Sequence, residues 1–370
     1  MTLRGIGCRL LFVALLTSSA SCRSCSAAVR RIHSAHSSAI APSTNSSAIG
    51  GGATAAASPQ AQQRGLPLYL PLKADSVRFA VIGDSGTGLR AQYEVAQEMI
   101  AYHTEFPFTF VTMMGDNIYG SETPADFAAK FEEPYKRLLE AGVKFYASLG
   151  NHDDPNERFY KNFNMGGQRY YAFSKGNVRF LALDSNYMDP QQLQWLETQL
   201  GRTDSAWKIC YFHHPLYSDG RYHGPDTDLR ALLRPLFVKY GVNAVLSGHE
   251  HLYERLRPQD GIYYFIVGNA GQLRPHDLRP SQEMAAGFDT DRCFMLVEIA
   301  GDQLYFQTIA RGGQTIDHGV LARQAKPSRS ALQLSHWPAL RKHLAASQGL
   351  SLAHEVRTPP PVMIDERRPG

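Results

Sequence analysis

The sequence predicts an α/β fold whose core is a mixed β-sheet. Short apolar runs rich in Val, Ile and aromatic residues, which are typical of buried strands, alternate with longer stretches of helical spacing through much of the 370-residue chain. Later strand-like runs follow one another without long helices between them. The sheet is therefore expected to be mixed rather than purely parallel.

The individual elements follow from these periodicities. The buried strands are expected at residues 77–82, 108–114, 143–149, 207–212 and 244–247. The helices between them, several of which begin at Pro or after an Asp or Thr cap, are expected at 89–103, 124–141, 190–200 and 227–240. The later strand-like runs are 169–173, 178–184, 262–267, 293–299 and 303–308.

Composition and charge exclude several classes of protein. With 43% hydrophobic and 19% charged residues, the chain can bury a sizeable core, which excludes a wholly disordered or fibrous protein. No run of about 18 apolar residues occurs, so no transmembrane helix is expected. The net charge of +4 comes from the two ends, because residues 71–323 hold 25 basic and 31 acidic residues. A nucleic-acid partner is therefore not expected, since its binding surface needs basic residues clustered on the fold itself.

The chain divides into four segments by composition. Residues 1–29 are expected to be a signal peptide, because Arg4 and Arg9 precede a short apolar run and small residues follow it, so the protein is expected to be secreted or otherwise exported. A transit peptide and a lipoprotein anchor at Cys22 remain alternatives. Residues 30–70 are an Ala/Ser/Gly-rich linker, 71–323 the catalytic domain and 324–370 a basic, Pro-containing tail.

Two cysteines lie in the expected folded body. Cys210 and Cys293 each sit inside an apolar, strand-like run. Two buried free thiols are expected here rather than a disulfide.

Polar residues able to bind metal follow five of the predicted strands. The motifs are Gly-Asp-Ser-Gly at 83–86, Gly-Asp-Asn-Ile-Tyr at 115–119, Gly-Asn-His-Asp at 150–153, His-His-Pro at 213–215 and Gly-His-Glu-His at 248–251. The carboxyl ends of strands in an open α/β sheet are where ligands bind, so these side chains are expected to converge.

The residue types indicate a site for two metal ions. Carboxylate and Tyr oxygens suit hard ions such as Fe(III), whereas imidazole suits Zn, Fe(II) and Mn. His249 and His251 are two residues apart on an extended segment, so they point to the same side. Asp116 is placed to bridge two metals about 3.5–4 Å apart, a spacing used in the hydrolysis of phosphate esters.

The set of motifs resembles the calcineurin-like metallophosphoesterase superfamily, and more closely the purple acid phosphatases in their short, animal-type form. The resemblance covers roughly residues 75–310 and includes the spacing from His213 to Pro225. It implies a four-layer sandwich, in which two mixed β-sheets are flanked by helices and the metals lie between strand ends.

The resemblance also implies a role for each site residue. Fe(III) would be held by Asp84, Asp116, Tyr119 and His251. The second, divalent ion (Fe, Zn or Mn) would be held by Asp116, Asn151, His213 and His249.

Three further histidines have expected places in or beside this site. His152 and His223 match the catalytic histidines that contact phosphate and the leaving-group oxygen. The family pattern His-x-Pro makes His213 rather than His214 the expected ligand, and His214 is expected to face the opposite side of its strand.

The expected function is that of a binuclear acid phosphatase. Bound Fe(III) would supply an activated water for attack on phosphorus even in acid, and a protonated His223, with His152, would protonate the leaving group. The expected substrates are small phosphate monoesters or phosphorylated proteins. A phosphodiesterase or nucleotide pyrophosphatase on the same scaffold is the enzymatic alternative, which Tyr119 disfavours because most such relatives lack a Tyr there. The alternative from another class is a non-catalytic binding protein that retains the fold.

Overall fold

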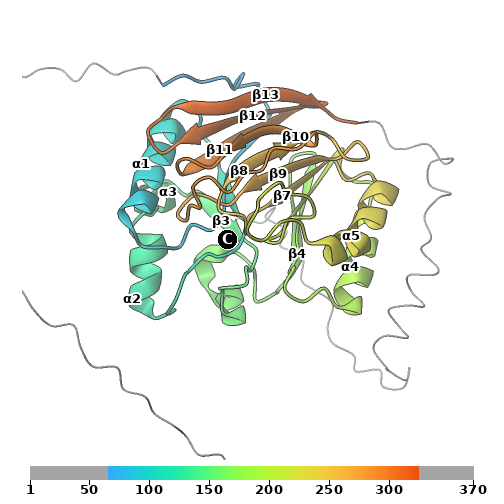
Figure 1. The fold of residues 1–370 in the computed structure, drawn as a ribbon, viewed down its shortest axis with the longest axis horizontal. Helices are drawn as coiled ribbons and strands as arrows, with labels where there is room; N and C mark the ends of the chain where they lie inside the picture. Colours follow the sequence, from blue (N-terminus) through green and yellow to red (C-terminus); the bar gives the residue numbers. More distant parts are fainter. Residues whose placement is uncertain (1–65, 325–370) are drawn as a thin grey trace, which may run out of the picture. The chain divides into compact units, whose positions relative to one another are not determined.

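Two β-sheets pack face to face in the computed structural model, which describes residues 66–324 (Figure 1). The expected signal peptide, most of the linker, and the tail from residue 325 onward lie outside the described residues. Within residues 66–324, no helix is long and apolar enough to cross a membrane.

The first sheet has six strands and a mixed topology. Its central strand, β1, pairs parallel with β2 and antiparallel with β11. On the β2 side, β2 and β3 are parallel, and on the β11 side, β11, β12 and β13 are antiparallel to one another in turn. In spatial order its strands are β13 (Thr315–Ala322), β12 (Gln303–Ala310), β11 (Cys293–Ala300), β1 (Val77–Ile82), β2 (Phe110–Met113) and β3 (Lys144–Ala147).

The second sheet has seven strands. Its four middle strands, β9, β7, β6 and β5, are parallel, while β8 and β10 on one side and β4 on the other pair antiparallel. In spatial order they are β10 (Met284–Phe288), β8 (Tyr253–Leu256), β9 (Tyr263–Val267), β7 (Ala244–Ser247), β6 (Trp207–Tyr211), β5 (Val178–Ala182) and β4 (Tyr171–Lys175).

Helices cover the outer faces of the two sheets. Figure 1 shows α1 (Arg90–Glu105), α2 (Pro124–Phe127) and α3 (Lys136–Glu140) on one side, with α4 (Pro190–Leu200) and α5 (Thr227–Tyr240) on the other. Short 3₁₀ turns lie at Pro155–Phe159 and Lys161–Phe163. The predicted α/β fold with two mixed sheets and flanking helices is confirmed.

Aromatic side chains fill the space between the sheets. The ring of Phe79 on β1 lies 5.1 Å from that of Phe110 and 5.2 Å from that of Phe180, which belongs to the other sheet. On the outer face of the second sheet, Leu196 and Leu233 pack in a separate cluster. The buried layer between the sheets holds the strand ends of both sheets in a fixed relation.

The helix expected over residues 124–141 is wrong as a single element. It is broken into α2, a π-helical turn at Ala128–Glu132, and α3. Pro134 lies between the last two pieces and has no N–H to donate to the preceding turn, so the regular hydrogen-bond ladder ends there.

Three strands were not expected from the sequence: β8, β10 and β13. Strands β10 and β13 lie at sheet edges and consist of partly exposed and exposed residues with none buried, so they lack the continuous apolar run of a buried strand. The two free thiols were expected correctly, since Cys210 and Cys293 are both buried and unpaired.

The body of the fold begins before residue 71. Leu70 is buried, and the side chain of Gln307 donates to the carbonyl of Pro67 while its oxygen accepts from the N–H of Tyr69, at 2.7 and 2.9 Å. Residues 66–70, which the sequence assigns to the linker, therefore pack against the first sheet.

Candidate metal centre

The predicted ligands meet at one place because the strand ends of both sheets point there. They follow strands in a simple order: Asp84 after β1, Asp116 and Tyr119 after β2, Asn151 after β3, His213 after β6, and His249 and His251 after β7. The first four residues come from the six-stranded sheet and the last three from the seven-stranded sheet.

One group of donor atoms comes from both sheets. The hydroxyl oxygen of Tyr119 lies 3.3 Å from Oδ1 of Asp84 and 3.2 Å from Nε2 of His251. Nε2 of His251 is also 3.4 Å from Oδ1 of Asp84. Three different donor atoms thus lie around one point.

A second group surrounds the imidazole of His213. Its Nε2 lies 2.9 Å from Oδ1 of Asn151, 3.1 Å from Nδ1 of His249 and 3.4 Å from Oδ1 of Asp116. Nδ1 of His213 contacts the carbonyl of Met114 at 2.8 Å, which orients the ring so that Nε2 faces the other donors.

Asp116 belongs to both groups. Besides its contact with His213, one of its carboxylate oxygens lies within 4.8 Å of ligand atoms of Asp84 and His251. A single carboxylate with two oxygens can therefore reach both donor groups.

The backbone at three of these residues adopts a conformation that L-residues rarely use. Asp84, Asp116 and His249 have φ values of 52°, 51° and 69°, in the left-handed region. Asp and His are among the residue types enriched there, and such conformations concentrate at functional sites. Each turn aims its side chain away from the strand direction and toward the other loops.

Two glycines make this approach possible. A Cβ at Gly150 would lie 2.1 Å from Oδ1 of Asp116, and a Cβ at Gly248 would lie 2.5 Å from Oδ2 of Asp84. Any larger residue would displace these carboxylates, so both positions need glycine.

The charges at the site are not balanced by the protein alone. Asp84 and Asp116 are almost completely buried. Burial, and then the charge of Asp116, raise the pKa of Asp84, and burial followed by both carboxylates raises the pKa of Tyr119. Burial also raises the pKa of Asp116, but nearby His213 and the N–H of His152 lower it overall. Neighbouring buried anions of this kind call for a cation between them.

The histidines are suited to bind that cation. Burial is the main cause that lowers the pKa of His213 and of His249, and it lowers the pKa of His251 to about 3. Their rings are therefore neutral near pH 7 and keep a lone pair for a metal. Ligands about 2.0–2.2 Å from one ion lie about 3.0–3.5 Å apart, and the donor atoms here are 2.9 to 3.4 Å apart. The residues present fit a two-metal centre.

The two expected catalytic histidines lie at the rim of this centre, and both are exposed. The N–H of His152 donates to Oδ1 of Asp116 at 3.0 Å, and its ring lies 5.1 Å from that of Tyr119. The ring of His223 lies 4.0 Å from that of His249. Both side chains can therefore reach a molecule that sits on the donor groups.

His214 does not face the opposite side of its strand, so that expectation is wrong. Its ring lies 4.4 Å from that of His249, and it forms a possible ligand group with His213 and His249. Alternation of side chains ends with β6 at Tyr211, so it does not apply to His214. Ser185 fixes the ring through a 2.8 Å contact between its Oγ and Nδ1 of His214.

Two acidic residues that the sequence analysis did not assign hold the loops together. Asp153 accepts from the N–H groups of Asn117 and Gly150, each at 2.7 Å, and so ties the loop after β2 to the loop after β3. Glu250 accepts from the N–H groups of His223 and Gly224. Both residues lie inside the motifs at 150–153 and 248–251, and this position was the sequence feature that could have identified them.

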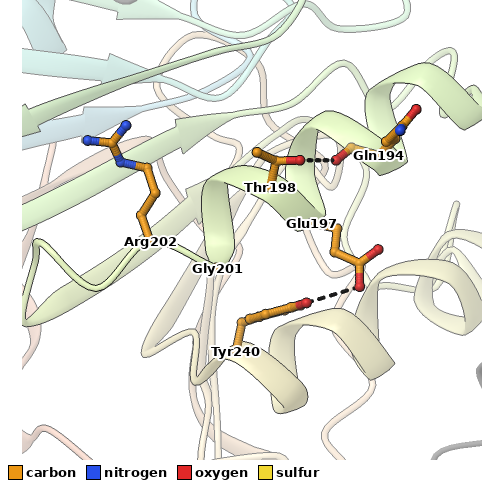
Figure 2. Close-up of a pocket in the computed structure, with 6 residues that line it drawn as sticks. All are labelled: Gln194, Glu197, Thr198, Gly201, Arg202 and Tyr240. Atoms are coloured by element: carbon orange, nitrogen blue, oxygen red, sulfur yellow. Dashed lines mark hydrogen bonds between the residues drawn. The ribbon is translucent and has the colours of Figure 1, made fainter.

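A cavity of about 410 Å³ lies next to Asn151 and His214. Its wall also includes Ser185, Asn186 and Tyr187. Another cavity, of about 560 Å³, lies between the ends of α4 and α5, where Glu197 accepts from the hydroxyl of Tyr240 (Figure 2). Its lining has no histidine and only one carboxylate, so the first cavity is the one that adjoins the metal-binding chemistry.

Comparison with known proteins agrees with this geometry. Residues 77–253 match the calcineurin-like phosphoesterase family, a span that contains every predicted ligand. The chain is 27% identical over 316 residues to human tartrate-resistant acid phosphatase type 5, covering 70% of this chain and 96% of the relative.

Two solved structures share the fold. The anchor protein GAP50 of the Plasmodium inner membrane complex has a TM-score of 0.61 at 19% identity, covering 72% of this chain and 95% of GAP50. The purple acid phosphatase PPD1 of yellow lupin has a TM-score of 0.54 at 18% identity, covering 70% of this chain and 55% of that protein. At these identities the two likenesses show the fold alone.

Proposed function

Residues 77–253 are a calcineurin-like phosphoesterase domain, and on that premise we propose that the protein is a binuclear metal-dependent acid phosphatase that hydrolyses phosphate monoesters. The observation that carries this proposal is the shared position of Asp116, whose carboxylate reaches both donor groups. Two bridged metal ions are a common arrangement for in-line displacement at phosphorus.

The proposed ligand sets follow from the two donor groups. Asp84, Asp116, Tyr119 and His251 would hold Fe(III), because three of them offer hard oxygen donors. Asp116, Asn151, His213 and His249 would hold a divalent ion, Fe, Zn or Mn. When bound, the metals would supply an activated water and neutralise the charge of the phosphate.

Side chains of the protein would contact the phosphate and protonate the leaving group. His152 and His223 are exposed at the rim, where a phosphate on the donor groups would meet them. His223 would give a proton to the oxygen of the departing alcohol, and His152 would donate to a phosphate oxygen. Glu250 orients the loop that carries His223, because it accepts from the N–H groups of His223 and Gly224.

Metal content and activity of the full chain test the proposal together. The wild-type protein should bind about two metal ions and hydrolyse 4-nitrophenyl phosphate. Asn151→Ala and His213→Ala should each lose the divalent ion and nearly all activity, because a vacant ligand position weakens metal binding. His318→Ala is a matched control, since His318 is exposed and stacks on Tyr69 at a distance from the centre.

Three results would contradict parts of this proposal. Normal turnover and two metals in either ligand variant would show that the ligand assignment is wrong. Cleavage of bis(4-nitrophenyl) phosphate without cleavage of the monoester would indicate a phosphodiesterase. A wild-type protein that binds no metal and has no activity would indicate a binding protein that retains the fold.

A further inference from the structure

An arginine lies against the loop that carries His249 and His251. The backbone N–H of Arg274, in the segment after β9, donates to the carbonyl of His251 at 3.1 Å. The main chain at Arg274 is therefore tied directly to the metal-binding loop.

The guanidinium of Arg274 is held without an anionic partner. Its Cζ lies 3.8 Å from the centre of the Tyr222 ring, and its Nη1 is buried with no hydrogen-bond partner in residues 66–324. By contrast, Arg255 pairs with Asp317 at 2.7 Å. Arg274 thus keeps a positive charge and unused donors beside the centre.

Two carboxylates lie near Arg274, and each accepts a backbone N–H of the loop that carries Tyr222 and His223. Glu250 accepts from the N–H groups of His223 and Gly224, and Asp277 from the N–H of Tyr222 at 3.4 Å. Within residues 66–324 neither carboxylate forms an ion pair with Arg274, although Oε2 of Glu250 is itself buried without a hydrogen-bond partner. They shape the loop around the arginine without pairing with its Nη1.

Arg274 is next to the proposed proton donor. The ring of Tyr222 lies 4.6 Å from that of His223, whose ring in turn lies 4.0 Å from that of His249. Tyr222 is 67% exposed, so this side of the site is open to solvent. The leaving group of a phosphate ester would depart past His223, toward Tyr222 and Arg274.

We propose that Arg274, positioned by Tyr222, binds a second anionic group on the leaving group, so that the site prefers phosphate monoesters with a carboxylate or phosphate near the ester oxygen. The guanidinium offers paired donors that match the oxygens of either group. This inference rests on the proposed function. Water adds to the phosphorus and the bond to the ester oxygen breaks. That oxygen leaves with a proton from His223, giving inorganic phosphate and an alcohol that still carries its carboxylate or second phosphate.

Matched substrates test this preference. The full, metal-loaded chain should cleave 3-carboxyphenyl phosphate with a kcat/KM about 10-fold above that for phenyl phosphate, as expected for one charge-assisted contact. Arg274→Gln should bring this ratio to about one. Tyr222→Ala should lower it, because the guanidinium loses the ring that holds it. Arg279→Gln is the control, an exposed arginine on the same segment, and should keep the ratio.

Binding of phosphonates gives a readout that does not depend on turnover. By calorimetry, 3-carboxybenzylphosphonate should bind wild type about 10-fold more tightly than benzylphosphonate, and Arg274→Gln should remove the difference. A ratio of one in wild type in both measurements, or a preference that survives Arg274→Gln, would overturn the role of Arg274. If both phosphates are cleaved without preference, this inference fails and the phosphatase stands. If neither is cleaved but the phosphonate preference depends on Arg274, the phosphatase proposal fails, and of this inference only the binding of a second anionic group by Arg274 is supported.

Discussion

The hydroxyl oxygen of Tyr119 lies 3.3 Å from Oδ1 of Asp84, although the two residues are 35 positions apart in the chain. They follow β2 and β1, which are neighbouring parallel strands, so the two loops leave the same edge of the sheet. The same oxygen lies 3.2 Å from His251 of the other sheet. Because its oxygen lies between donors from both sheets, a substitution of Tyr119 can show which metal the site holds.

Tyr119→Phe should remove visible absorbance from the metal-loaded protein. A phenolate bound to Fe(III) absorbs visible light, so the wild type should be purple or pink, and Phe lacks the oxygen. The ring contact with His152, 5.1 Å between centroids, should persist, so thermal stability should change little. The visible spectrum and the iron content measure the outcome. An active wild-type protein that is colourless and free of iron would contradict the iron assignment while leaving phosphoesterase chemistry intact.

His223→Asn should slow substrates with basic leaving groups more than activated ones. A general acid contributes roughly 10²–10⁴-fold, and its contribution is largest when the departing oxygen is basic. The loss in kcat on an alkyl phosphate should therefore greatly exceed the loss on 4-nitrophenyl phosphate. His318→Asn serves as the control for an exposed histidine outside the site. Equal losses on both substrates would assign His223 to substrate binding instead of proton transfer.

Gly150→Ala should lower metal occupancy and activity together. The added Cβ would meet Oδ1 of Asp116 at 2.1 Å and its backbone N at 2.3 Å, so the shared carboxylate must move. Overpacking of this kind also costs about 1–3 kcal/mol of stability. Gly312→Ala is the matched control, because a Cβ there has no atom within 4 Å and the backbone is not left-handed. Two metals per chain and normal turnover in Gly150→Ala would show that Asp116 tolerates displacement.

The stability of the protein should fall with rising pH because of Glu254. This side chain is fully buried, and burial raises its pKa to about 8 from an ordinary value of 4.5, although the N–H of Asp219 donates to it. Below pH 4.5 the Glu254 carboxyl is protonated in both the folded and the unfolded chain, so its contribution to the free energy of unfolding is fully present. Between pH 4.5 and about 8 only the folded chain keeps it, so stability falls by about 1.4 kcal/mol per pH unit.

Glu254→Gln isolates this contribution, because the amide keeps the shape of the side chain and does not titrate in this range. The free energy of unfolding in urea should be measured for both proteins across this pH window. The wild-type value minus the variant value should decrease as pH rises. A constant difference would show that Glu254 is ionised in the folded protein throughout.

The meeting of the candidate ligands at one place could be predicted from the sequence because the information for it is local. A buried strand is recognised by a short apolar run, and the residues that follow it lie at its carboxyl end, as with Asp84 after β1 and His249 after β7. Five such strand ends with metal-binding residue types were enough to indicate a two-metal site. Of the three strands missed, β10 and β13 have residues that are partly exposed and carry no continuous apolar signal, and β8 is only four residues long.

Packing between distant segments decides which donor atoms lie close together. The contact of His213 with Asn151, the turn of His214 toward His249, and the unpaired guanidinium of Arg274 all depend on how loops from separate strands meet. No periodicity within a short window carries that information, because each contact joins residues separated by tens of positions. The motifs determined which candidate ligands the chain offers, and the stacking of two sheets determined which of their donor atoms lie close together.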